Sequence, residues 1–74
     1  MIGYHAMAKG NYDYAIKVFQ LNVKAFPKSA NALDSLAEGY MKGGYKKEAI
    51  VNYQKSLEMN PANHNAKEML AKLQ

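Results

Sequence analysis

Residues able to do acid–base or metal chemistry are few in this chain and lie far apart. His5 and His64 are the only histidines, and they stand near opposite ends with no second histidine within a helical turn. A zinc site or a catalytic base needs converging partners, so we interpret both as surface or helix-end residues. Cysteine is absent, which excludes thiolate metal sites and disulfides.

Other catalytic patterns are also missing from the sequence. No serine, histidine and aspartate stand at mutually supportive positions, no pair of catalytic carboxylates is present, and no phosphate-binding loop occurs. The Gly43-Gly44 pair is too short to cradle phosphate and is typical of a helix end. We therefore predict that the chain is not an enzyme and uses no metal or cofactor.

A run of three charged residues at four-residue spacing has two interpretations. Asp34, Glu38 and Lys42 are each four residues apart, so they share one face of a helix. The two carboxylates repel by a few tenths of a kcal/mol, and Lys42 is positioned to form an ion pair with Glu38 that offsets this repulsion. One interpretation is a plain surface ion pair. The other is an acidic spot that meets a basic or amide-rich peptide segment.

Length and composition indicate one small domain. The 74 residues are 49% hydrophobic, and the net charge of +4 comes with ten lysines and no arginine. Bidentate capture of phosphates or guanine edges is mainly a task of arginine, so the basic balance is interpreted as solubilising and no nucleic acid is predicted as a partner. No apolar run approaches the roughly 20 residues of a membrane span, so no membrane association is predicted.

The spacing of apolar residues predicts five short helices, with buried stripes that include Phe19 and Phe26 in the second helix and Tyr53 in the fourth. We expect one in residues 2–9, then one each from Tyr12 to Phe26, from Ser29 to Gly43-Gly44, from Tyr45 to Asn60 and from Asn63 to Leu73. Asn11, Ser29 and Asn63 are the expected N-caps, and prolines follow the second and fourth helices. Connections of two to four residues require consecutive helices to be antiparallel neighbours. Small residues are expected where helices approach closely, namely Gly3, Ala15, Ala37, Ala49 and Ala71.

The chain repeats itself at a fixed offset of thirty-four residues. Pro27 and Pro61 are separated by that distance. The same offset relates Ile2 to Leu36, Gly3 to Ala37, Met7 to Met41, Gly10 to Gly44, Ala15 to Ala49, Ile16 to Ile50, Phe19 to Tyr53 and Gln20 to Gln54. A period of this length is typical of stacked helical repeats, which bind macromolecules on extended surfaces.

Residues 30–63 resemble one tetratricopeptide repeat, the family whose pattern is Leu-Gly or Leu-Ala, Tyr, Ala, an aromatic residue and a closing Pro. The matching residues are Leu33, Leu36, Ala37, Tyr40, Gly44, Ala49, Tyr53 and Pro61, while Ser56 stands where a small Ala is usual. Residues 1–27 resemble an incomplete first repeat, and residues 64–74 resemble the terminal capping helix. The resemblance implies a single domain over residues 1–74, an all-α right-handed solenoid of stacked antiparallel helix pairs.

One departure from the family concerns the start of the chain. The first helix begins at the position equivalent to Leu36, so the opening turn of that repeat is missing. We expect either a fragment of a longer protein or a chain whose open end a second copy covers. In both cases apolar atoms of the 12–26 helix should be poorly covered, which favours self-association.

In this family the first helix of each pair lines a concave groove, and its ligand-facing positions carry over to this sequence. They are Tyr4, Met7, Asn31, Asp34, Ser35, Glu38, Met41, Lys42, Asn65, Glu68, Met69 and Lys72. Met7 and Met41 occupy one repeat position, and either a ligand contact or a place at the edge of the core fits them. The positions that clamp chaperone tails in some members carry Tyr4, Ser35, Asn65 and Met69. They form no cationic pair, so we predict no binding of such tails through that clamp.

Two functions from different classes follow. The favoured one is a non-catalytic protein-interaction module that binds a peptide or a neighbouring domain in the groove. The alternative is a structural appendage or fragment of a larger bacterial-type multidomain protein, forming a homo-oligomer through its incomplete first repeat. Electrostatic binding of RNA is a third and less favoured class, because the lysines are scattered along the chain.

Overall fold

The structure is a computed structural model that describes residues 2–74, with the side chain of Ile2 outside the description. Five helices and no strands make up this part of the chain. They are α1 (Ile2–Ala8), α2 (Tyr12–Ala25), α3 (Ala30–Gly43), α4 (Lys46–Met59) and α5 (His64–Leu73). The predicted all-α class and the helix bounds are thereby confirmed to within a residue or two. The predicted equivalence of Ile2 and Leu36 concerns the side chain of Ile2, which lies outside the part of the chain that the structure describes.

The helix ends are set by local chemistry. Asn11, Ser29 and Asn63 each accept a hydrogen bond from the backbone N–H three residues later, over 3.2 to 3.3 Å. Each side chain thus satisfies one of the backbone donors that a helix start leaves free. Gly44 ends α3 in the left-handed conformation with φ of 91°, which glycine adopts without steric penalty. All three predicted N-caps are confirmed.

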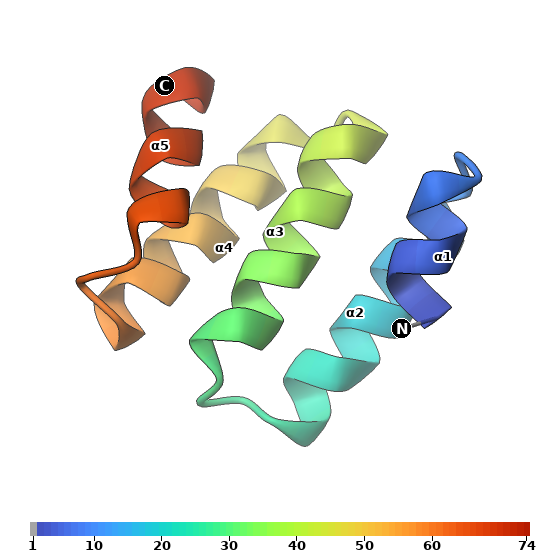
Figure 1. Ribbon diagram of the computed structural model, residues 1–74, viewed down its shortest axis with the longest axis horizontal. Helices are drawn as coiled ribbons and strands as arrows, with labels where there is room; N and C mark the ends of the chain where they lie inside the picture. Colours follow the sequence, from blue (N-terminus) through green and yellow to red (C-terminus); the bar gives the residue numbers. More distant parts are fainter. Residues whose placement is uncertain (1) are drawn as a thin grey trace.

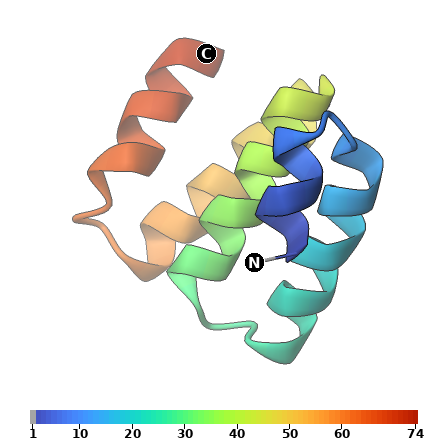
Figure 2. The ribbon, with the colours of Figure 1, turned by 45° about the vertical axis from the view of Figure 1, so that its right-hand side comes forward.

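The five helices form two layers. In Figure 1, α1, α3 and α5 lie toward the viewer, and α2 and α4 lie behind them. Consecutive helices run in alternating directions, and each packs mainly on its neighbour in sequence. Figure 2 shows the same order from the side of α1. The molecule is consequently flat, measuring 30 × 26 × 17 Å.

Two buried aromatic rings anchor the core at equivalent positions of the thirty-four-residue repeat. Phe19 of α2 and Tyr53 of α4 are only 0% and 1% exposed, respectively. Gly3 and Gly39 let α1 and α3 approach the Phe19 ring closely. A Cβ atom added at Gly3 would lie 2.5 Å from Phe19 Cε1, and one at Gly39 would lie 3.1 Å from Phe19 Cδ2. The lack of a side chain at Gly3 thus allows α1 to pack closely against α2.

Two predicted core or contact residues are instead exposed. Phe26 leaves the buried stripe of the 12–26 helix because its backbone turns away after Ala25, with φ of −130°, and its ring is 62% exposed. Ala71 was expected at a close helix approach, but α5 packs on α4 through Ala66 and Leu70, and Ala71 lies off that face. Among residues 2–74, no helix is both long and apolar enough to cross a bilayer.

Candidate functional site

A cleft of about 270 Å³ opens between α3 and α5. Its lining residues are Glu38, Met41 and Lys42 of α3, Tyr53 of α4, and Asn65 and Met69 of α5. All but Tyr53 were predicted from the sequence as groove residues. Tyr53 belongs to α4, which lies behind α3 and α5 in Figure 1, and is only 1% exposed, so we call it the floor of the cleft and the other lining residues its walls.

Helix periodicity places the wall residues. Glu38, Met41 and Lys42 are three and four residues apart on α3, and Asn65 and Met69 are four apart on α5. Such spacing stacks side chains one above another on the same helix face. The cleft therefore exists only if α5 starts at the right place beside α3.

A hydrogen-bond network sets that starting place. The Nδ2 group of Asn63, the residue that caps α5, donates to Asp34 Oδ2 of α3 over 2.8 Å and to Ser56 Oγ of α4 over 2.9 Å. Ser56 Oγ in turn donates to the carbonyl oxygen of Ala30 over 3.1 Å. The Asn63 side chain thus connects α5 with α3 and α4. Asp34, which was predicted to contact a ligand, accepts one of these hydrogen bonds within the protein. The hydroxyl also explains why a serine stands at position 56, which is 0% exposed.

The cleft lining includes one negative and one positive side chain, Glu38 and Lys42 of α3. Glu38 pairs with Lys42 at 3.4 Å, as the spacing predicted, but both side chains are partly exposed, so the pair contributes at most about 0.5 kcal/mol. The pKa of Tyr53 is raised well above its ordinary value of 10.0, first by burial and then by the charges of Glu38 and Asp34. Both carboxylates therefore act on the floor of the cleft.

Tyr4 and Ser35 join α1 to α3 and are not among the residues that line the cleft. The Tyr4 hydroxyl and Ser35 Oγ form a hydrogen bond of 2.7 Å, and the Tyr4 ring meets Phe19 edge to face with centroids 4.9 Å apart. Tyr4 remains 39% exposed. It extends the surface of α1, α3 and α5 without contributing to the cleft.

The other predicted groove residues do not line the cleft. Met7 is a correction, because it is only 6% exposed and lies in the core cluster with Ala6 and Leu36. It fills the space between α1 and α3, whereas its repeat equivalent Met41 faces the opening between α3 and α5. Three further predicted residues are exposed beyond the walls, namely Asn31, Glu68 and Lys72.

Sequence reasoning missed Tyr53 and Asn63 as parts of this site. Tyr53 was predicted to be a core residue, which is correct. A buried tyrosine, however, usually places its hydroxyl where it can reach a polar partner or water. The equivalent residue in the first repeat is Phe19, which has no hydroxyl. The tyrosine at a position where the first repeat has phenylalanine was the one feature of the sequence that could have indicated a role for Tyr53 in the site. Asn63 was recognised as a cap, and nothing local indicates that its amide reaches across to α3.

The chemistry of the cleft suits binding of a side chain. Two thioethers and a phenol ring offer a soft apolar surface, with the Glu38 carboxylate and the Asn65 carboxamide at its edge. Within residues 2–74, no three His, Cys, Asp or Glu side chains are grouped to hold a metal ion. Comparison with protein-family models and with curated proteins finds no match.

Proposed function

We propose that this chain is a non-catalytic protein-interaction module of the tetratricopeptide type, which binds a peptide or a segment of a neighbouring domain on the side of α1, α3 and α5. The observation that carries the proposal is the cleft between α3 and α5. It is bounded by Met41 and Met69 and has Glu38 at its edge.

The placement of repeat equivalents supports a stacked-repeat architecture. Ala15 and Ala49 are both 0% exposed, and Phe19 and Tyr53 are both core residues thirty-four positions apart. These two pairs of equivalent residues thus occupy the same core positions in the α1–α2 and α3–α4 pairs. Alternation of the helices between two layers is what stacking of antiparallel helix pairs produces.

The chemistry of the cleft indicates what kind of peptide would fit. A volume of about 270 Å³ is below the usual range for small-molecule sites, so it suits one or two side chains of a longer ligand. Methionines adapt to varied apolar side chains, and the Asn65 carboxamide can both donate to and accept from a peptide backbone. The Glu38 charge favours a lysine or arginine beside the apolar residue.

Selection from a displayed peptide library on the immobilised chain tests this proposal. We expect the selected peptides to combine an apolar residue with a neighbouring basic or amide residue. Glu38→Lys should weaken their binding at least about tenfold, measured by fluorescence anisotropy. Glu48→Lys is the matched control, because Glu48 is an exposed residue of α4 outside the cleft, and it should leave binding unchanged.

Two results would count against the proposal. One is a set of selected peptides that bind both charge-reversal variants as tightly as the unmodified chain. The other is a selection that yields no peptide at all, since a functional cleft on a folded module should enrich some sequence. Circular dichroism of each variant establishes that the helices are retained.

A further inference from the structure

The outward side of α2 carries large apolar residues. Tyr14 is 49% exposed and Leu21 is 67% exposed, and Phe26 follows the helix end at 62%. Tyr14 and Leu21 are seven residues apart, so they share the helix face opposite the buried Phe19. The prediction of poorly covered apolar atoms in the 12–26 segment is confirmed. We define the outer α2 face by Tyr14, Lys17, Leu21, Lys24 and Phe26.

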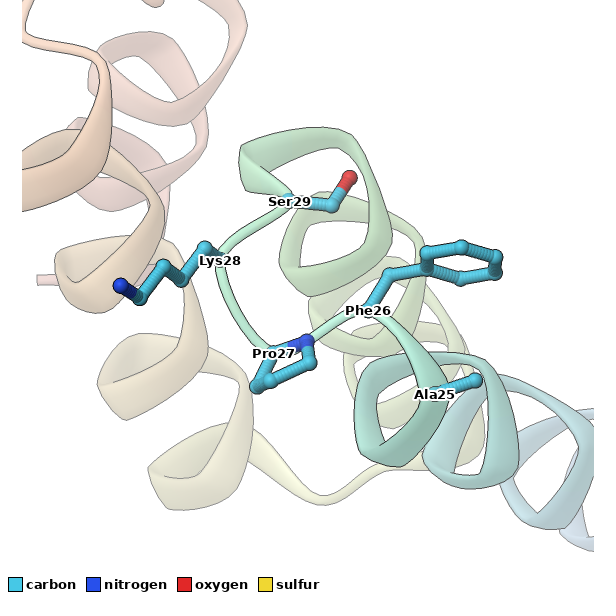
Figure 3. A pocket seen from close by; sticks show the side chains of 5 residues that line it. All are labelled: Ala25, Phe26, Pro27, Lys28 and Ser29. Atoms are coloured by element: carbon cyan, nitrogen blue, oxygen red, sulfur yellow. The ribbon is translucent and has the colours of Figure 1, made fainter.

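This face is hollowed at two places. A hollow of about 320 Å³ is lined by Lys17, Gln20, Leu21 and Lys24. A second one of about 430 Å³ lies at the turn into α3 and is lined by residues 25–29. Figure 3 shows the Phe26 ring projecting from this turn on the same side as Ala25, while Lys28 extends the other way. The exposed ring thus lies just beyond the end of α2.

Lysines border the apolar residues. Lys17 and Lys24 follow Tyr14 and Leu21 by three residues each, so they form one edge of the stripe. Neither lysine takes part in a salt bridge among residues 2–74. Asp13 is the one acidic residue of α2, and it accepts a hydrogen bond from the Tyr45 hydroxyl over 3.2 Å. The outer α2 face is therefore apolar and positively charged.

The repeat itself shows that the fold does not require these side chains. Thirty-four residues later, the positions of Tyr14, Leu21 and Phe26 are occupied by polar residues, namely Glu48, Lys55 and Asn60. Lys24 corresponds to Glu58 and Lys17 to Val51, so neither positive charge is kept in the second repeat. The α4 helix forms and packs with these residues. The repeat therefore folds without large apolar side chains at these three positions, and packing within the chain does not explain why Tyr14, Leu21 and Phe26 are exposed on and beside α2.

We propose that the outer α2 face docks an acidic amphipathic segment of another protein. Its apolar side chains would lie against Leu21 and Phe26, and its carboxylates would face Lys17 and Lys24. Charge complementarity selects this occupant. A second copy packed through the same face would set lysines against lysines, in a chain that already carries a net charge of +4.

The probe for this proposal is a synthetic peptide with leucine and phenylalanine on one helical face and glutamate on the other. It is acetylated and amidated, so it has no free terminal carboxylate. We expect it to bind, and to perturb NMR amide signals of α2 and the following turn while leaving those of α5 unchanged. A peptide with lysine in place of glutamate should bind at least about tenfold more weakly.

Two double variants locate the contact. Leu21→Lys/Phe26→Asn introduces the residues found at the equivalent positions of α4 and its C-cap, and it should weaken binding at least about tenfold. Lys17→Glu/Lys24→Glu should do the same while keeping the apolar residues. The matched control is Val51→Lys/Met59→Asn on α4, where the side chains are 46% and 45% exposed, and it should bind the probe unchanged.

Each alternative occupant gives a result that overturns the proposal. Equal binding of the acidic and basic peptides would show that charge is irrelevant. Perturbed signals centred on Met41 and Met69 would move the contact to the cleft. A dimer in sedimentation that Leu21→Lys/Phe26→Asn abolishes would assign the face to a second copy. Preferential binding to anionic phosphatidylglycerol vesicles or to duplex RNA, lost in the same variant, would replace the protein partner. Glu38→Lys, which tests the cleft, should leave the acidic probe bound.

Discussion

Replacing Asn63 by alanine should destabilise the protein far more than the loss of an ordinary helix cap. The substitution removes the cap of α5, together with hydrogen bonds to Asp34 and Ser56. A cap is worth about 1 kcal/mol, a hydrogen bond to a charged group about 1.5 to 3, and a neutral one about 1. Because these groups are only partly buried, we expect Asn63→Ala to lower the free energy of unfolding by about 3 kcal/mol.

The chain offers a matched control for this prediction. Asn11 caps α2 with the same side chain and the same bond to the N–H three residues later, but it is exposed and forms no other side-chain bond among the described residues. Asn11→Ala should therefore cost only about 1 kcal/mol. Asn63→Ser keeps a capping oxygen and loses the amide donors, so it should fall between the two alanine variants.

Urea unfolding followed by far-UV circular dichroism measures these differences, with equal slopes as the test of two-state behaviour. In a domain of this size each kcal/mol also shifts the thermal midpoint by about 4 to 8 °C, which gives a second readout. If Asn63→Ala and Asn11→Ala agree within about 0.5 kcal/mol, the network contributes nothing beyond the cap. The account of how α5 is positioned would then be refuted.

Three further predictions concern the core, the cleft floor and its edge. Gly3→Ala should lower stability by about 1 to 3 kcal/mol in thermal unfolding, because its Cβ would overlap the Phe19 ring; a neutral change would contradict the packing. The raised pKa of Tyr53 means that the unfolded chain releases this proton first, so stability falls as pH rises above 10.0. Tyr53→Phe should make that fall shallower by up to about 1.4 kcal/mol per pH unit, and parallel pH curves would refute it. Lys42→Ala should change stability by less than about 0.5 kcal/mol in urea unfolding, since its pair with Glu38 is partly exposed; a larger loss would show a stronger pair.

Local features of the sequence were sufficient to predict the helices. Caps and breakers act within a few residues, so Ser29, Asn63 and Gly44 determine helix ends wherever the helices finally pack. The apolar spacing and the thirty-four-residue offset likewise predicted that Phe19 and Tyr53 would be core residues. Most wall residues of the cleft followed from the same periodicity, because it identifies the helix face they share.

What a side chain does once the helices meet was decided by tertiary structure. Met7 and Met41 are repeat equivalents, yet Met7 fills the space between α1 and α3 while Met41 borders a cleft. The bonds from Asn63 to Asp34 and Ser56 span 29 and 7 residues, beyond the range of any local pattern. The start and end of each helix, and the position of its apolar face, followed from the sequence alone. These properties depend on neighbouring residues within one or two helical turns. Which faces are covered depends on distant helices, and only their packing settles it.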